Sequence, residues 1–315
     1  MILNLFNKMK SYLLIDGSYF IFYRVFALLV WWKNAKPEIE LGDPFKNEEF
    51  KDKFRTTFLN KINEIIKKLK IKNINKIIIG KDCPQNEIWR MKLHNTYKSG
   101  RNEKKNIEAN IGDFFKLTYN ENLFIQAGAD HILEYNTLEA DDCIALTTKY
   151  LLNKYENNIE NNIENNIENN IENNIENNIE NNIENNIENN IENNIEIYII
   201  TSDQDYLQLV SKNVKIYTLK YKLLTDAKTC KKDAKKDLFF KIIAGDKSDN
   251  IPSIFKKCGP KTIEKCFEDK DFFYNKLEKE DGSLEKYELN KILIDFNNIP
   301  NELKNSFLDY IVNLI

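Results

Sequence analysis

The sequence has little histidine, and its cysteines follow no metal-binding pattern. Only His94 and His131 occur in 315 residues, so a histidine-based zinc site or a Ser-His-Asp triad is not supported. The five cysteines include no Cys-x-x-Cys pair, and we expect reduced thiols of an intracellular protein at Cys83, Cys143, Cys230, Cys258 and Cys266.

Three other patterns are missing. No Gly-x-x-x-x-Gly-Lys-Ser/Thr element is present, so a phosphate-binding loop for ATP-driven work is not supported. The apolar run 20–32 contains Arg24 and is too short to cross a bilayer. No signal-peptide cleavage pattern is visible at the start. We therefore expect a soluble protein without a membrane partner.

What the sequence has in abundance is a repeat. Residues 157–196 are a perfect tandem of Asn-Asn-Ile-Glu. One isoleucine every fourth residue drifts by about 40° per repeat on a helix, so no straight apolar face forms. Asn is also a poor helix former. We predict that this low-complexity insert is disordered or a protruding marginal helix, and that it leaves the rest of the fold intact.

The repeat also hides the charge of the remaining chain. The formal net charge is −3, but the repeat carries ten Glu and no base, so the rest of the chain is at +7. Residues 215–265 hold 14 Lys against 6 acids. A solvated lysine-rich surface is one reading of this stretch. Beside an acidic metal site, it is what a protein that binds and cuts a phosphate backbone would need.

Short apolar runs alternate with amphipathic segments along the chain. Five runs have the composition of buried strands, whereas the apolar residues of 47–69 recur at helical spacing. We also predict helices over 18–32 and from an N-cap at Thr137 through residue 152, and only helices after residue 235. The alternation predicts an α/β fold with a doubly wound, mostly parallel sheet. The predicted strands are 12–16, 76–80, 131–134, 197–201 and 214–218.

Acidic residues follow these runs more often than turns require. Open α/β folds place their sites where the carboxyl ends of parallel strands meet. A single acid is explained by a turn or a helix N-terminus, but many carboxylates at one edge repel one another unless cations lie among them. Oxygen ligands suit Mg²⁺ or Mn²⁺, and two such ions can bind a phosphodiester and activate water. The predicted ligands are Asp16, Asp82, Glu139, Asp141, Asp142, Asp203, Asp205, Asp246 and Asp249.

The segment 89–101 interleaves cations with aromatic residues. Arg and Lys can neutralise a phosphate, and Tyr or Trp can stack on an unpaired base. A solvated basic helix would show the same pattern. Because the segment follows the strand that leads to Asp82, we predict a clamp over the metal site.

Five motifs in order resemble the 5′-nuclease family: flap endonucleases, phage 5′-exonucleases and the nuclease domain of bacterial DNA polymerase I. The resemblance covers most of residues 11–270 apart from the repeat. The motifs are Asp16-Gly17-Ser18 with Arg24, Tyr97-Lys98-Ser99-Gly100-Arg101, Glu139-Ala140-Asp141-Asp142, Ser202-Asp203-Gln204-Asp205-Tyr206-Leu207-Gln208-Leu209, and Gly245-Asp246-Lys247-Ser248-Asp249-Asn250-Ile251-Pro252. The resemblance implies a PIN-like (resolvase-like) sheet with flanking helices and a C-terminal helix–three-turn–helix region.

The resemblance also implies a role for each site residue. A first metal, which generates the attacking hydroxide, would be held by Asp16, Asp82, Glu139 and Asp141. A second metal and its waters would be held by Asp142, Asp203, Asp205, Asp246 and Asp249. A helical arch would bring Lys98 to the scissile phosphate, and the further catalytic residues would be Arg24, Arg90 and Arg101.

Residues 244–270 would grip the duplex backbone, helped in relatives by a K⁺ ion on hairpin carbonyls. The stretch 253–262 departs from the family, because it has an extra residue and keeps only Gly259 of a Gly-rich motif. This departure bears on the K⁺ site and on close approach of the backbone to phosphate. The predicted nucleic-acid-binding residues are Tyr97, Lys247, Lys256, Lys257, Gly259, Lys261 and Thr262.

We therefore predict a catalytic domain over 11–243, with the arch inside 83–122, and a helical DNA-binding region over 244–315. The predicted function is a divalent-metal-dependent, structure-specific 5′-nuclease. It would act as a monomer on the 5′ end or flap of branched DNA, or on an RNA primer, in replication and repair. A PIN-like ribonuclease and a DNA-junction-binding module without catalysis are the alternatives.

Overall fold

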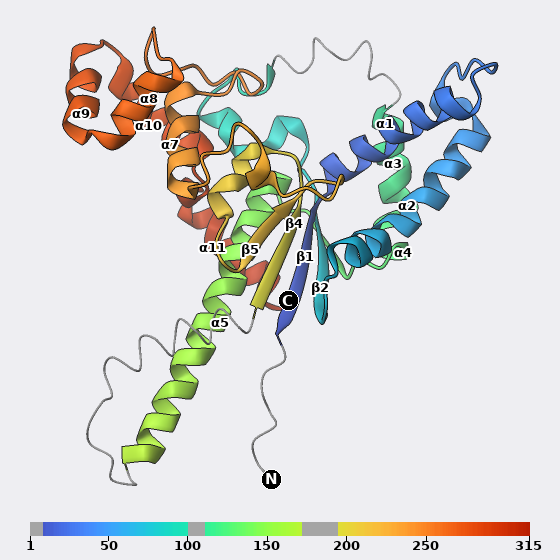
Figure 1. The fold of residues 1–315 in the computed structure, drawn as a ribbon, viewed down its shortest axis with the longest axis horizontal. Helices are drawn as coiled ribbons and strands as arrows, with labels where there is room; N and C mark the ends of the chain where they lie inside the picture. Colours follow the sequence, from blue (N-terminus) through green and yellow to red (C-terminus); the bar gives the residue numbers. More distant parts are fainter. Residues whose placement is uncertain (1–8, 100–110, 172–194) are drawn as a thin grey trace.

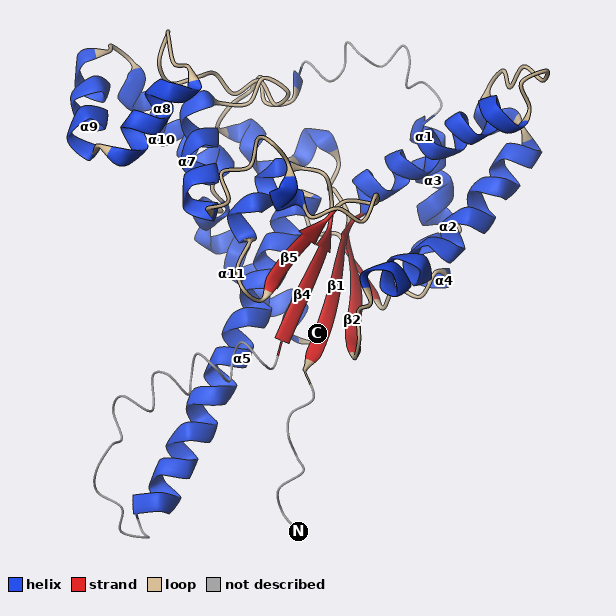
Figure 2. Cartoon of the chain, in the orientation of Figure 1, coloured by secondary structure: helices blue, strands red, loops and turns tan. Residues whose placement is uncertain are grey.

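A single parallel sheet organises the part of the chain that the computed structural model describes, residues 9–99, 111–171 and 195–315 (Figures 1 and 2). The strands lie in the order β3-β2-β1-β4-β5, and all neighbouring pairs are parallel. They are β1 (Lys10–Asp16), β2 (Ile74–Gly80), β3 (His131–Leu133), β4 (Ile195–Ile200) and β5 (Val214–Tyr217). The five predicted strands and the α/β class are confirmed.

The central strand β1 is buried on both faces. Leu14 pairs with Ile78 on one side and with Ile199 on the other, and all three side chains are fully buried. Strands covered on both faces need continuous apolar runs, which is what the sequence supplies here. The chain builds β2 and β3 on one side of β1 and then crosses to β4 and β5. The switch point therefore lies between β1 and β4, where such folds bind ligands.

One face of the sheet is covered by α1 (Gly17–Ala35), α2 (Glu48–Leu69), α3 (Ile111–Asn120) and α4 (Leu123–Gln126) (Figure 1). Edge-to-face and tilted aromatic pairs form their core, through Phe20, Phe50, Phe54, Phe58, Phe114 and Phe124. Of the predicted arch, 83–122, the helix α3 thus belongs to the core. Residues 100–110, including Arg101, lie outside the described residues, and the arch stays a prediction.

The other face is covered by α5 (Ala140–Ile171) and α11 (Asn301–Val312) (Figure 1). The predicted N-cap at Thr137 is wrong, because α5 begins three residues later and Thr137 has a left-handed φ of 68°. The repeat was predicted to be disordered or a protruding marginal helix, and its described residues belong to two elements of the fold. Residues 157–171 continue α5, and the last two repeat residues, Ile195 and Glu196, begin β4 and pair with β1.

The C-terminal part forms a third core. It contains α7 (Ala234–Ala244), α8 (Pro260–Glu268), α9 (Lys270–Lys279) and α10 (Ser283–Ile294), and Cys83, Ile88 and Tyr97 pack into it. Short 3₁₀ helices join the larger elements: η1 (Pro44–Lys46), η2 (Gln85–Glu87), η3 (Trp89–Lys92), η5 (Gln204–Leu209), η6 (Leu224–Asp226) and η7 (Phe296–Asn298). Among the helices described here, none is long and apolar enough to cross a bilayer.

Candidate metal centre

Asp16 stands where β1 ends and α1 begins. Its Oδ1 accepts a hydrogen bond from the Tyr19 amide at 2.9 Å, so it caps α1, and its Oδ2 accepts from the Thr201 hydroxyl at 3.1 Å. The next residue must be glycine, because a Cβ on Gly17 would lie 2.7 Å from the Gly80 carbonyl oxygen. The tight turn holds Asp16 at the switch point.

Asp82 lies two residues beyond β2 and is held by the first turn of α5. Its Oδ1 accepts a hydrogen bond from the Ala140 amide at 2.9 Å, and its Oδ2 accepts from the Ser18 hydroxyl at 2.5 Å. Gly80 allows this approach, because a Cβ there would lie 2.8 Å from the Ala140 carbonyl oxygen. These contacts bring the ends of β1, β2 and α5 together.

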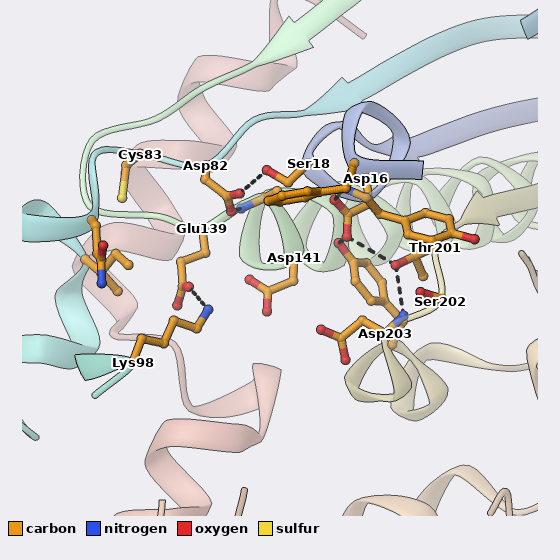
Figure 3. A pocket seen from close by; sticks show the side chains of 16 residues that line it. Asp16, Ser18, Asp82, Cys83, Lys98, Glu139, Asp141, Thr201, Ser202 and Asp203 are labelled. Carbon is orange, nitrogen blue, oxygen red and sulfur yellow. Dashed lines mark hydrogen bonds and ion pairs between the residues drawn. The ribbon is translucent and has the colours of Figure 1, made fainter. Parts of the chain in front are cut away.

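Asp203 follows β4 and caps η5, with Oδ1 accepting from the Asp205 amide at 3.0 Å. Together with Asp16, Asp82, Glu139 and Asp141, it lines a cleft of about 410 Å³. Figure 3 shows these carboxylates directed into one space from separate elements. These five acids thus meet at the carboxyl edge of the sheet, where the sequence predicts that acids converge. We call Asp16, Asp82, Asp141 and Asp203 the open acids.

The open acids share the cleft with Lys98, but its ammonium pairs with Glu139. In residues 9–99, 111–171 and 195–315, no Lys or Arg forms an ion pair with any of the four. Burial, and then the charges of Asp82 and Asp203, raise the pKa of Asp16 to about 7. Burial, followed by the charges of Asp142 and Glu139, raises the pKa of Asp141 well above its usual range. Oxygen donors that repel one another in this way fit a divalent cation.

Glu139 and Asp142 differ from the open acids, because both form ion pairs with Arg90. Its guanidinium donates to Asp142 at 2.7 Å and to Glu139 at 2.9 Å, and its Nε donates to the Leu293 carbonyl at 2.8 Å. Asp142 also accepts from the Trp89 indole at 3.0 Å. Arg90 and Asp142 are buried. Arg90 was predicted to assist at the scissile phosphate, and Asp142 to hold or orient the second metal. In the structure neither residue lines the cleft, and the two form a buried ion pair.

Lys98 reaches the cleft from the turn after η3. Its ammonium forms an ion pair with Glu139 (Figure 3), although its backbone has a left-handed φ of 56°. Burial disfavours the Glu139 anion, but Lys98 and then Arg90 outweigh it and lower the pKa of Glu139. Lys98 therefore lines the cleft, and its contact with a scissile phosphate stays a prediction.

The turn that carries Lys98 is tied to the loop after α7. The Lys98 amide donates to the Asp249 carbonyl at 3.0 Å. The Asn250 side chain donates to the Thr96 carbonyl at 3.1 Å and to the Ser99 hydroxyl at 2.9 Å. The clamp segment and the predicted duplex-binding loop are thus one hydrogen-bonded unit.

A second acidic group lies next to the cleft. Carboxylate oxygens of Asp205, Asp246 and Asp249 lie within 4.8 Å of one another. Here a lysine is already present, since the Lys241 ammonium lies 2.6 Å from Asp205 and 2.5 Å from Asp246. Burial opposes ionisation of Asp246, but Lys241 and Ser248 lower its pKa to about 2. Burial and Asp203 raise the pKa of Asp205 to about 7, despite Lys241. We call this group the clasped acids.

Other predicted residues lie elsewhere. Tyr97 was expected to contact nucleic acid, but it is buried and donates to Glu139 at 3.0 Å. Arg24 is half-buried outside the cleft, and its Nε finds no hydrogen-bond partner in the described residues. Thr262 is half-buried, whereas the other predicted nucleic-acid residues are exposed: Lys247, Lys256, Lys257, Gly259 and Lys261.

Sequence reasoning missed three residues that shape the site. Thr201 and Ser18 hold Asp16 and Asp82, and each lies within two residues of an acidic motif, which is a usable signal. Lys241 lies in the basic stretch 215–265, but nothing in the sequence separates it from the surrounding lysines. Its pairing depends on α7 packing against η5.

Comparison with solved structures defines the class of fold. The chain has a 5′-nuclease fold, as the resemblance implied. No family model matches it. It is similar to the bacteriophage T5 5′-exonuclease with bound zinc, at 14% identity and a TM-score of 0.57, over 96% of this chain and 99% of that one.

Two further solved structures extend the likeness. The T5 protein co-crystallised with metal ions matches with the same identity, TM-score and coverage. The T5 flap endonuclease in a pseudo-enzyme-product complex with DNA and metal ions matches at 13% identity and a TM-score of 0.57, over 96% of this chain and 98% of that one.

Proposed function

We propose that the protein is a divalent-metal-dependent 5′-nuclease. It would hydrolyse phosphodiester bonds at the 5′ end or flap of branched DNA during replication or repair. The observation that carries this proposal is the set of open acids, which share one cleft at the switch point and form no ion pair with a Lys or Arg of the described residues. Solved T5 structures with the same fold contain metal ions and DNA, which supports a metal-dependent reaction on DNA.

The open acids would hold the ion, as their donor chemistry fits Mg²⁺ or Mn²⁺. A bound divalent ion would lower the pKa of water and favour negative charge on the leaving oxygen. The roles of contacting the phosphate and of positioning the acids would fall to side chains of the protein. Lys98 presents its ammonium at the cleft beside Glu139, where it would meet the scissile phosphate. Arg90 holds Glu139 and Asp142 from below and thereby positions α5.

The clasped acids would take a second ion only if the Lys241 ammonium moved aside, because it already pairs with two of the three carboxylates, Asp205 and Asp246. We therefore infer unequal sites: one that needs a cation to be stable and one that has an ammonium in its place.

The substrate is proposed from the C-terminal surface. Lys256, Lys257 and Lys261 are exposed close in sequence to the N-terminus of α8, where Gly259 is the N-cap, and Lys247 is exposed in the loop after α7. Backbone amides at a helix N-terminus and nearby ammonium groups bind phosphates. Duplex DNA is the ligand that this surface would take, with an RNA primer strand and a K⁺ ion at the hairpin as further proposals.

The test is cleavage of a 5′-labelled flap duplex, a single strand and a blunt duplex in Mg²⁺ and in EDTA. We expect a Mg²⁺-dependent cut at the flap junction. Asp203→Asn should abolish it, and Asp52→Asn, an exposed acid on α2, is the matched control. Faster cutting of RNA stem–loops would favour the ribonuclease. A flap that is bound but never cut would mean a binding module.

A further inference from the structure

A second groove opens beside the acidic cleft. It lies between α1 and the loop 218–227, has a volume of about 450 Å³, and shares the lining residues Tyr19 and Ser202 with the cleft. The two spaces therefore adjoin at Tyr19 and Ser202, and the Tyr19 amide donates to the carboxylate of Asp16 in the cleft. We call this space the side groove.

The wall of the side groove is aromatic. Tyr19 and Tyr23 stand one turn apart on α1, with ring centroids 6.0 Å apart and planes tilted by 55°. Both rings are half-buried and keep part of their surface open. Leu223 and Leu224 add apolar lining. Such a wall suits a flat, largely apolar group, and the volume falls in the range of small-ligand sites.

The rim of the side groove is cationic. Lys220 and Lys222 line it and are exposed. In the described part of the chain, neither forms an ion pair. Asp226 also lines the groove, so the lining carries one acid against two lysines. The charge suits a ligand with a phosphate group.

The loop is held in place without any ligand. The Leu219 amide donates to the Tyr19 hydroxyl at 3.0 Å. Tyr221, in a left-handed conformation with φ 60°, points to α2, where its hydroxyl accepts from Lys61 at 2.6 Å and donates to Glu64 at 2.5 Å. Tyr221 thus anchors the loop while its two lysine neighbours line the groove. A preformed site loses less entropy when it binds.

We propose that the side groove binds one unpaired nucleotide that adjoins the phosphodiester held in the acidic cleft. Its base lies against Tyr19 and Tyr23, and its phosphate faces Lys220 and Lys222. The inference rests on the proposed nuclease function and adds a subsite that recognises a nucleotide through its base.

The binding arm of the test needs no catalysis. A flap duplex with 5-iodouracil as the unpaired base at the junction is irradiated with the full-length protein in EDTA, and the cross-linked peptide is mapped. We expect a cross-link to residues 19–23. A cross-link elsewhere, at the same yield, overturns the subsite.

The kinetic arm compares the normal flap with one that is abasic at the same nucleotide. Because stacking of one base on an aromatic ring changes affinity by about tenfold, Tyr23→Leu should raise KM about tenfold for the normal flap and leave the abasic flap unchanged. Tyr23→Phe keeps the ring and should behave as wild type. Equal KM values of the wild type for both flaps overturn the subsite even if Tyr23→Leu does not fold.

The charge arm replaces both rim lysines. Because each neutralised phosphate on a single strand contributes about 0.7 to the slope of log affinity against log salt, and both lysines face one phosphate, Lys220→Gln with Lys222→Gln should reduce the slope by up to about 0.7. Lys228→Gln, an exposed lysine outside the groove lining, is the control. An unchanged slope contradicts the proposal. Wild-type protein that cleaves neither flap but cross-links through residues 19–23 would refute the nuclease function and leave the subsite standing.

Discussion

The open and the clasped acids are neighbours with the same chemistry, but only the clasped acids include carboxylates that pair with a lysine of α7. The open acids repel one another, and the pKa of Asp16 is raised to about 7 by burial, Asp82 and Asp203. Among the clasped acids, Lys241 and Ser248 bring the pKa of Asp246 down to about 2 in spite of burial. A carboxylate cluster is therefore not one kind of site. Whether such a cluster needs a metal ion to offset its charge depends on which Lys and Arg side chains already pair with it.

The largest expected effect is the loss of an open acid. Removing outer-shell partners of a metal costs about 10–100-fold, so Asp203→Asn should reduce cleavage by more than about a hundredfold while flap binding in EDTA survives. The measurement is single-turnover cleavage beside a gel shift. Full retained activity would contradict the metal-site assignment.

The second-largest expected effect is the loss of the Lys241 ion pairs with Asp205 and Asp246. Lys241→Met keeps the aliphatic stem but leaves Asp205 and Asp246 unneutralised. Since hydrogen bonds to charged groups contribute about 1.5–3 kcal/mol, Tm in EDTA should fall by about 3–8 °C. Mg²⁺ should then raise Tm more than it does in the wild type. Lys236→Met, on the same helix but paired with Glu264, is the control. Equal Mg²⁺ responses would refute the difference between the sites.

A pH dependence follows from the raised pKa values of Asp16 and Asp205, both about 7. Between pH 3.8 and 7 the native state binds more protons than the unfolded state, so the free energy of unfolding decreases as pH rises. In EDTA, Tm should therefore fall from pH 5.5 to 8, and less so in Asp16→Asn. Saturating Mg²⁺ should flatten or reverse the trend, because ionised ligands bind metal better. A Tm that rises with pH in EDTA would contradict the raised pKa values.

The smallest expected effect concerns the repeat, which lies outside both clusters. Deleting 161–192 keeps Ile195 and Glu196 in β4 and should change turnover by less than about twofold. Deleting all of 157–196 also removes those residues, which pair with Lys10 and Ser11, and should lower Tm. A matched loss of activity in both deletions would assign the repeat a role in function.

The five strands and the edge where the acids meet were predictable, because apolar runs and the residues after them are local signals. The split within Glu139-Ala140-Asp141-Asp142 was not. Neighbouring residues on a helix point about 100° apart, so Asp141 faces the cleft while Asp142 faces Arg90. The sequence alone does not show which of the two carboxylates faces the cleft, because Arg90 lies 52 residues away from its partner Asp142.

Lys241 shows the same limit for the clasped acids. It is one of many lysines in 215–265, and only the packing of α7 against η5 selects it. The buried Tyr97 is another case, because an aromatic residue among cations predicts an exposed stacking surface, whereas the third core takes up its ring. Sequence patterns predict which residue types lie at the carboxyl edge of the sheet. Contacts between distant segments then determine whether each carboxylate is paired with a cation.

The bond from Arg90 to the Leu293 carbonyl of α10 has a consequence for modularity. The arginine that neutralises Glu139 and Asp142 is itself fastened to the C-terminal helices, while α11 closes the core on the far face of the sheet. A fragment truncated after α7 would lose both supports at once. The part of the chain that carries the acidic cleft should therefore not keep its geometry as an isolated fragment, and we expect limited proteolysis within α8–α10 to disturb the cleft.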